Sequence, residues 1–149
     1  MHLYRDNIVF LIAKVHQRSQ GVLRKHLQSH GLTPVQCLFL ETLWEEDGLP
    51  VGEIGRKLTV DTATLTGVLD RMESAGWVRR RYDPFDGRIA RIFLTGMAKE
   101  AAKDLMACIT CVNHELLNKF SHEEKILLKR LLLDLKGGST VRTLPGRPN

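Results

Sequence analysis

The stretch from residue 54 to residue 95 constrains the fold of this chain more than any other. The segment IGRKL at 54–58 is separated by only three residues from the hydroxyl-rich segment TATLTGVL at 62–69, which suits two helices joined by a tight turn. The sequence WVRRRYDPFDGRIARIFLT at 77–95 follows directly, and its DPFDG run at 83–87 supplies turn residues between two strand-like segments. The sequence therefore predicts a helix-turn-helix followed by a two-stranded hairpin.

Apolar residues at helical spacing predict further helices on both sides of this unit. Gly31 is placed to end the first helix as a left-handed cap, and Thr33 before Pro34 is placed to open the next as N-cap and first helical residue. Ser121 with Glu124 three residues later has the sequence of a capping box. We expect helices over residues 3–29, 34–46, 51–58, 61–75, 96–119 and 121–136, and strands over residues 77–82 and 88–94.

The apolar faces of these helices predict which residues form the core. In the helix at 61–75 four apolar residues face inward, which leaves Thr62, Thr64 and Thr66 exposed near its start. The predicted core residues are Val35, Leu38, Phe39, Thr42 and Leu43 in the second helix, Ile54 and Leu58 in the third, and Leu65, Val68, Leu69 and Met72 in the fourth.

The last predicted helix is apolar on every side. Its apolar residues surround the helix axis instead of forming one stripe, which is more than a small domain covers and which a second copy of the chain could cover. These residues are Ile126, Leu127, Leu128, Leu131, Leu132, Leu133 and Leu135. The expected fold class is mainly α (α+β): a winged helix-turn-helix lobe with a two-stranded wing, flanked by N- and C-terminal dimerisation helices.

The composition is that of a soluble globular domain whose charge suits a polyanion. The 149 residues carry a net charge of +5 and have a pI near 9.3. Residues 79–91 hold five arginines against Asp83 and Asp86, a local charge of +3 that leaves +2 for the rest of the chain. The longest N-terminal apolar run, residues 8–13, is too short to span a bilayer, and three cysteines without framework spacing suit a reducing compartment. We therefore expect a cytoplasmic protein with no membrane partner.

In this order of parts, the chain resembles the multiple-antibiotic-resistance regulator (MarR) family of bacterial transcription factors. The resemblance covers nearly all of residues 3–136 and is carried by LTPVQCLFLETLWEEDG, IGRKLTVDTATLTGVLDRMESAGWVRR and DPFDGRIARIFLT. Its most specific part is the wing pattern D-x-R-x-x-x-I-x-L-T, from Asp86 to Thr95, together with the preceding R-M-E-x-x-G-W-V.

This resemblance implies a homodimer held by helices at 3–30 and 96–136, with a DNA-binding lobe at 34–95. It also implies a small-molecule pocket between the dimer region and that lobe, and an aromatic or lipophilic acid as the effector. Carried over by position, Arg88 is the wing arginine that enters the minor groove, and Asp86 is the carboxylate that orients an arginine nearby. We expect residues 1–149 to form a single domain ending in a disordered, Gly/Pro-rich tail at 137–149.

Seven residues are candidates for contact with double-stranded DNA. A hydroxyl-rich helix after a tight turn suits the major groove, and a basic hairpin suits the backbone or the minor groove. The alternative is structural: capping and surface decoration for the threonines, and a solvated hairpin for the arginines. Gly67 and Gly87 stand where relatives commonly carry basic residues, which weakens the expected contact. The candidates are Thr62, Thr64 and Thr66, Arg56 and Lys57 in the preceding helix, and Arg88 and Arg91 in the hairpin.

For an aromatic residue at the hairpin tip and for two cysteines we favour a structural role over a functional one. Phe85 at the hairpin tip is expected to pack against its own turn, with a wedge against sugar or base as the alternative. Cys108 and Cys111 lie inside a helical apolar pattern, so we interpret them as buried packing residues rather than a metal or redox pair. His16 and Cys37 are candidates for the effector pocket.

The leading hypothesis is a ligand-responsive transcriptional regulator that binds a pseudo-palindromic operator as a homodimer. Repression is the favoured sign of regulation. The alternative is a metal- or thiol-based stress sensor that uses the same DNA-binding module, and a nonspecific architectural DNA protein ranks lower. We expect no catalytic residues, because the sequence contains no nucleophile–base pair, glycine-rich phosphate loop or paired carboxylates at a strand end. We also expect no metal site or cofactor: His16, Cys37, Glu41, Cys111 and His114 could come together after folding, but histidines as scattered as these rarely form a metal site.

Overall fold

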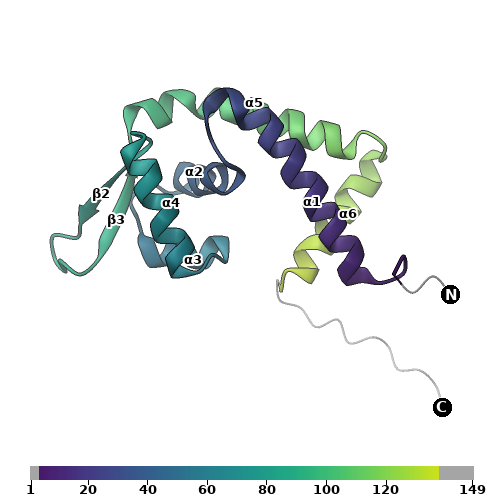
Figure 1. Ribbon diagram of the computed structural model, residues 1–149, viewed down its shortest axis with the longest axis horizontal. Coiled ribbons are helices and arrows are strands. Elements are labelled where there is room, and N and C mark those ends of the chain that lie inside the picture. The colour runs from purple at the N-terminus through teal and green to yellow at the C-terminus, as the bar shows by residue number, and fades with distance from the viewer. Residues whose placement is uncertain (1–3, 138–149) are drawn as a thin grey trace, which may run out of the picture. The chain divides into compact units, whose positions relative to one another are not determined.

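A computed structural model describes residues 4–137 of the chain, and it confirms the predicted mainly helical fold with a winged helix-turn-helix lobe (Figure 1). The last twelve residues of the predicted tail, 138–149, lie outside the described part. The elements in chain order are α1 (Ile8–Leu27), a 3-10 turn (Gln28–His30), α2 (Pro34–Glu45), β1 (Leu49–Pro50), α3 (Val51–Leu58), α4 (Thr62–Ser74), β2 (Val78–Tyr82), β3 (Ala90–Leu94), α5 (Gly96–Leu117) and α6 (His122–Leu135).

The first helix begins later than its apolar pattern predicts. α1 starts at Ile8 because the Asn7 side chain accepts hydrogen bonds from the backbone N of Val9 (2.9 Å) and of Phe10 (3.4 Å). At the other end the chain tightens into a 3-10 turn and stops at Gly31, whose φ of 65° is the predicted left-handed cap.

The predicted starts of the later helices are confirmed by their capping hydrogen bonds. Thr33 and Gln36 form a capping box at α2, in which the Thr33 backbone N donates to the Gln36 side chain at 2.9 Å. Ser121 and Glu124 do the same at α6, where the Ser121 backbone N donates to Glu124 Oε2 at 2.8 Å. Asp61 caps α4. Each of these bonds joins residues three apart, which is why the sequence alone located them.

The sheet has one strand more than the sequence predicts. β2 and β3 form the expected antiparallel hairpin, and β1 joins the outer side of β3, giving the order β1-β3-β2. Leu49 of β1 pairs with Ile92, and Asp47 just before it accepts a hydrogen bond from the Leu94 backbone N at 2.8 Å. A strand of two residues has no periodicity of its own, so only its partner more than forty residues away defines it.

Gly48 allows this third strand to approach the hairpin. Its φ is 80°, and a Cβ at this position would lie 2.7 Å from Cε1 of Phe93, closer than real contacts allow. Its backbone N donates to the carbonyl of Ile92 at 2.9 Å. A side chain is therefore excluded here both by the backbone conformation and by the neighbouring ring.

The chain divides into two compact units, with the boundary after Asn113. In the first unit the predicted inward face of α4 is confirmed, but the predicted face of α2 is partly wrong. Leu38 is 40% exposed, whereas Cys37 and Leu40 are fully buried. The reason is that α2 packs against α1, α3, α4 and β3, so most of its circumference is enclosed and an apolar stripe does not identify its open side.

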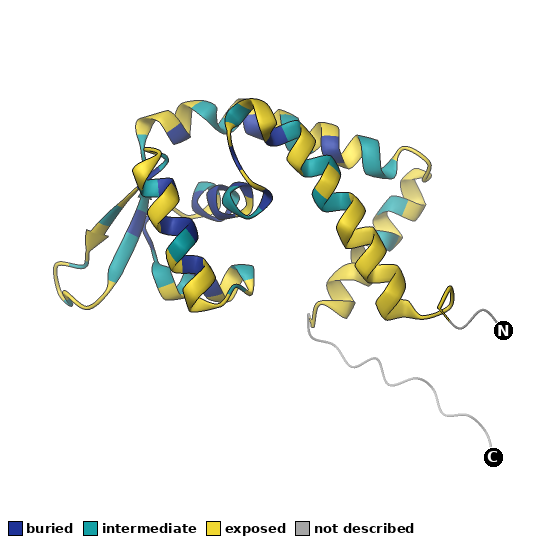
Figure 2. Cartoon of the chain, viewed as in Figure 1, coloured by how far each residue is buried: buried dark blue, intermediate teal, exposed yellow. Residues whose placement is uncertain are grey.

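In the second unit α6 contains no buried residue (Figure 2). Large apolar side chains are 45–65% exposed at six positions of α6. Three of them, Leu127, Leu131 and Leu135, are spaced four apart and share one face. The first half of α1, in the other unit, likewise exposes Ile8, Val9 and further apolar residues. Among the described residues, no helix combines the length and apolarity that crossing a bilayer requires.

Candidate nucleic-acid interface

The start of α4 presents three threonines to solvent. Thr62, Thr64 and Thr66 are all exposed, as the sequence predicts. The hydroxyl of Thr64 donates to Asp61 Oδ2 at 2.6 Å, and that of Thr66 donates to the carbonyl of Thr62 at 2.9 Å. These bonds use the hydroxyl protons and leave oxygen lone pairs and methyl groups for an external partner. The hydrogen bonds from Thr64 also lower the pKa of the Asp61 carboxyl, which keeps the cap ionised.

The turn between α3 and α4 brings these two helices close together. Thr59 occupies the left-handed region with φ of 53°, and the Val60 backbone N donates to the carbonyl of Gly55 at 3.0 Å. Gly55 is buried, and a Cβ there would lie 3.0 Å from Cδ2 of Leu65 on α4. A small residue at this position therefore fixes how closely α4 packs on α3, and with it the angle at which α4 leaves the lobe.

Arg88 and Arg91 occupy different environments in the hairpin. The Arg88 side chain is 92% exposed, and its Nε donates to Asp86 Oδ1 at 3.1 Å. Arg91 is 38% exposed and is held by Asp83 Oδ2 at 2.7 Å and by the carbonyl of Gly48 at 3.1 Å. Both carboxyl pKa values are lowered, above all by the hydrogen bonds from these arginines. Arg88 can therefore extend outward from one contact, whereas Arg91 ties the hairpin to the segment before β1.

The three arginines of β2 point to alternate faces of the sheet, as the geometry of a strand requires. Arg80 contacts α4, where its Nη2 lies 2.8 Å from Asp70 Oδ1 and 3.9 Å from Glu73 Oε2. Arg81, on the other face, lies over the Phe93 ring at 5.6 Å from its centre. Arg79 is exposed. The carboxylates of α4 thus offset the positive charge of Arg80. The net positive charge of the hairpin lies on its exposed arginines.

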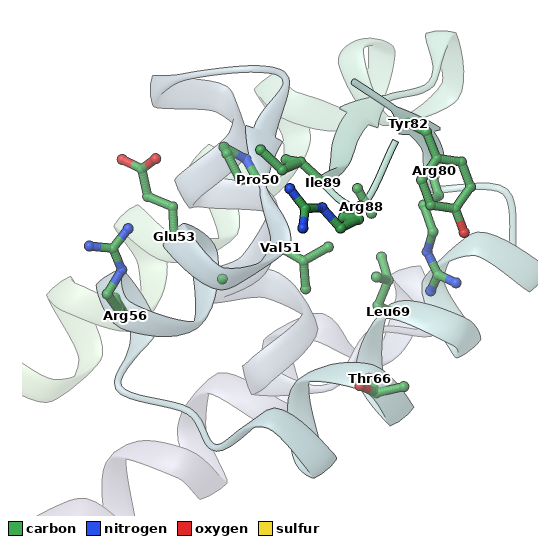
Figure 3. Close-up of a pocket in the computed structure, with 12 residues that line it drawn as sticks. Pro50, Val51, Glu53, Arg56, Thr66, Leu69, Arg80, Tyr82, Arg88 and Ile89 are labelled. Atoms are coloured by element: carbon green, nitrogen blue, oxygen red, sulfur yellow. The ribbon is translucent and has the colours of Figure 1, made fainter. Parts of the chain in front are cut away.

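A groove of about 560 Å³ lies between α3, α4 and the hairpin (Figure 3). Arg56 from α3, Thr66 from α4 and Arg88 from the hairpin all reach it, so the structure brings three of the predicted residues together. Lys57 is instead paired with Glu46 at 3.4 Å. Arg80 and Tyr82 also line the groove, and neither is among the predicted contact residues. Their spacing of two, which places them on one face of β2, is the signal that could have found them.

The two residues predicted for an effector pocket are not brought together in this way. His16 is exposed on α1, whereas Cys37 is fully buried in the core of the first unit. The Cys37 thiol donates to Glu41 Oε1 at 3.6 Å. Burial, reinforced by the Glu41 carboxylate, raises the pKa of this thiol to about 12. At neutral pH it is protonated and shielded, which is the opposite of what a reactive thiolate needs.

The other cysteines are more accessible than predicted. Cys108 is half-buried and Cys111 is exposed, so the interpretation of both as buried packing residues is wrong for Cys111 in the single chain. The helical apolar pattern misplaced it because α5 is covered on only part of its surface, with Leu105 and Val112 among its buried residues. Within residues 4–137 no three His, Cys, Asp or Glu side chains gather closely enough to hold a metal ion.

These environments predict an order of thiol reactivity. We expect iodoacetamide at pH 7.5 to label Cys111 first and Cys108 more slowly, with Cys37 unlabelled until the protein unfolds, because alkylation requires an accessible thiolate. Mass spectrometry of the digested protein over time measures this order, and the same reaction in guanidinium chloride is the control. Rapid labelling of Cys37 in the folded protein would contradict the raised pKa and favour a thiol sensor.

The exposed start of α4, the tight turn before it and the arginine-bearing hairpin after it define a winged helix-turn-helix DNA-binding protein. The MarR family model matches residues 32–90, from the loop before α2 to the first residue of β3. The chain is 32% identical over 138 residues to the organic hydroperoxide resistance transcriptional regulator of Bacillus subtilis, covering 90% of each protein. The chain belongs to the MarR family of DNA-binding transcriptional regulators.

The chain is also similar to a curated sequence and to two solved structures. TtmR of Methylorubrum extorquens, an HTH-type transcriptional regulator, is 39% identical over 122 residues, which are 78% of this chain but only 62% of TtmR. A mutant MarR from E. coli solved with operator DNA aligns with a TM-score of 0.79 at 27% identity, covering 84% of this chain and 90% of that one. BpsR of Bordetella bronchiseptica, whose DNA binding is regulated by 6-hydroxynicotinic acid, aligns over 91% of this chain and 97% of its own, with a TM-score of 0.85 at 17% identity.

Proposed function

We propose that this protein is a ligand-responsive repressor that binds a pseudo-palindromic operator as a homodimer. The observation that carries this proposal is that exposed Thr66, Arg56 and Arg88 line one groove in the protein surface. They come from α4, from α3 and from the hairpin. α4 enters the major groove, and the hairpin follows the adjacent backbone into the minor groove. Since α4 has Arg71 as its only cation, the hairpin and the end of α3 supply most of the electrostatic attraction.

The seven predicted contact residues divide by what the structure leaves available to DNA. Thr62, Thr64 and Thr66 offer methyl groups and hydroxyl oxygens to base edges and phosphates. Arg88 reads the minor groove, where a narrow A·T-rich segment concentrates negative potential. Arg56, Lys57 and Arg91 contact phosphates, and Arg91 and Lys57 do so while retaining their partners Asp83 and Glu46.

The dimer is held by the terminal helices, residues 3–30 and 96–136. The support for this is the exposed apolar surface of α6 and of the first half of α1, which a folded monomer leaves in water. Two copies related by a twofold axis place two α4 helices in successive major grooves, with half-site centres about 10 base pairs apart.

The effector is an aromatic or lipophilic acid bound between the dimer region and the DNA-binding lobe. This part of the proposal rests on the family and on the occurrence of a ligand-regulated protein, BpsR, with the same fold. An acid that binds one separation of the two lobes better than the other shifts the dimer away from the DNA-competent form.

Operator binding is tested by selection from a random duplex pool followed by titration. We expect the selected sequence to be pseudo-palindromic, to take up two chains per duplex, and to bind about 10³-fold more tightly than random duplex at the same salt concentration. Fluorescence anisotropy at fixed salt measures both affinities. Equal affinity for selected and random duplexes would instead indicate an architectural DNA protein.

A further inference from the structure

Phe85 is the most exposed large apolar side chain in the described part of the chain. Its exposed fraction is 98%, against 71% for Val9, the next highest. The prediction that it packs against its own turn is therefore wrong. A fully solvated phenylalanine gains nothing from the fold, so the fold does not explain its presence at the hairpin tip.

The backbone that carries Phe85 is held firmly. Asp83 Oδ1 accepts hydrogen bonds from the backbone N of Phe85 at 2.8 Å and of Asp86 at 3.3 Å. The loop is closed on both sides, because the Asp83 backbone N donates to the carbonyl of Ile89 at 2.8 Å and the Ile89 backbone N donates to that of Asp86 at 3.0 Å. Pro84 restricts the remaining backbone freedom. The ring is thus presented to solvent by an ordered turn, and little conformational entropy is lost when it meets a partner.

The charges around Phe85 indicate what that partner is. Arg88, three residues away in the same turn, has a side chain that is 92% exposed. The two carboxylates of the turn, Asp83 and Asp86, are each bonded to an arginine. An exposed ring beside an exposed guanidinium suits a partner that combines apolar surface with negative charge. The minor groove of DNA has this combination, since deoxyribose forms its walls and phosphates line its edges.

Building on the proposed operator binding, we propose that Phe85 enters the minor groove with Arg88 and packs its ring against deoxyribose at a base step, which it partly unstacks. Arg88 supplies electrostatic attraction, and Phe85 supplies apolar contact that does not depend on salt. Pyrimidine–purine steps open most easily, so Phe85 favours operators with such a step beneath the hairpin.

The test compares Phe85→Ala, Phe85→Leu and Arg88→Ala on the selected operator over a range of salt concentrations. We expect Phe85→Ala to weaken binding about tenfold without changing the slope of log affinity against log salt, because no charge is removed. Phe85→Leu keeps an apolar wedge and should lie between Phe85→Ala and the wild type. Arg88→Ala should lower affinity and also reduce the slope. Thermal unfolding serves as the control for folding, since removal of a 98% exposed ring should leave the melting temperature unchanged.

A second measurement reports on the base step itself. We expect 2-aminopurine placed under the hairpin to brighten when the wild type binds, because unstacking relieves its quenching, and to stay dim with Phe85→Ala. Full affinity of Phe85→Ala together with weakened Arg88→Ala would overturn the role of Phe85 and leave the proposed function intact. Failure of the wild type to bind any selected duplex would overturn the proposed function. Loss of self-association in Phe85→Ala with unchanged DNA affinity would assign the ring to a second copy of the chain instead.

Discussion

Arg88→Ala is expected to weaken operator binding by about 1–3 kcal/mol, or about 5- to 150-fold, without destabilising the fold. The side chain is 92% exposed and its only ion pair in the described structure is with Asp86, so its removal leaves no cavity and no buried unpaired charge. The substitution removes one positive charge from the hairpin. Because α4 has a single arginine, the lobe depends on the hairpin for attraction to DNA. Titration of the selected operator by fluorescence anisotropy at several salt concentrations measures the loss.

Two matched variants separate charge from geometry. Arg88→Lys keeps the charge but loses the planar guanidinium, so it should recover the salt dependence and only part of the affinity. Lys119→Ala removes the same charge from an exposed position between α5 and α6, outside the helix-turn-helix lobe. With its self-association verified as equal to that of the wild type by sedimentation velocity, this variant should bind the operator with nearly unchanged affinity. Equal losses in Arg88→Ala and Lys119→Ala would reduce the role of Arg88 to net charge alone.

Leu131→Lys is expected to weaken the proposed dimer, with a dissociation constant raised on the order of 10- to 10²-fold. The estimate follows from losing about half of the 1.5–3 kcal/mol that full burial of a leucine contributes, at each of two subunits, because the other half of the side chain is already covered in the single chain. In the single chain Leu131 is 46% exposed and α6 has no buried residue, so the substitution costs the monomer little. Operator affinity should fall with it, because two lobes that bind one duplex as a unit lose their high effective concentration.

Sedimentation velocity over a range of protein concentrations measures this change, and far-UV circular dichroism verifies that the helices remain. Asp134→Asn on the same helix is the matched control, since it also raises the net charge by one, by removing a negative charge, but removes no apolar surface. A Leu131→Lys protein that still sediments as a dimer would move the interface away from α6, and a wild type that is monomeric would remove the proposed dimer altogether.

Hydrogen bonds between residues close in sequence are the part of this protein that the sequence predicted well. The caps at Thr33, Asp61 and Ser121 and the left-handed end at Gly31 were all located correctly. The inward face of α4 was also correct, because that helix is covered on one side only and its apolar period is visible.

Errors arose where a residue's environment depends on elements far away in the chain. Leu38 was misassigned to the core since α2 is enclosed by four other elements, and Cys111 was misassigned since α5 is covered over only part of its surface. Strand β1 was missed entirely. Among the candidate site residues, exposure could be inferred for Thr62, Thr64 and Thr66, and the family resemblance singled out Arg88 as the wing arginine. No local pattern showed that Arg91 is anchored by Asp83 and the carbonyl of Gly48.

The sequence by itself determined where α2, α4 and α6 begin and where the hairpin turns, because each depends on side chains that reach backbone groups two or three residues away. It also showed directly which segment is hydroxyl-rich. Only the tertiary structure decided that Asp83 and the carbonyl of Gly48 hold Arg91, that Arg88, Arg56 and Thr66 meet at one groove, and that Phe85 is left in water. These outcomes depend on the pairing of β1 with β3 and on the packing of α4 against the hairpin, which join residues ten to more than forty positions apart. No local pattern encodes which residues such contacts leave exposed.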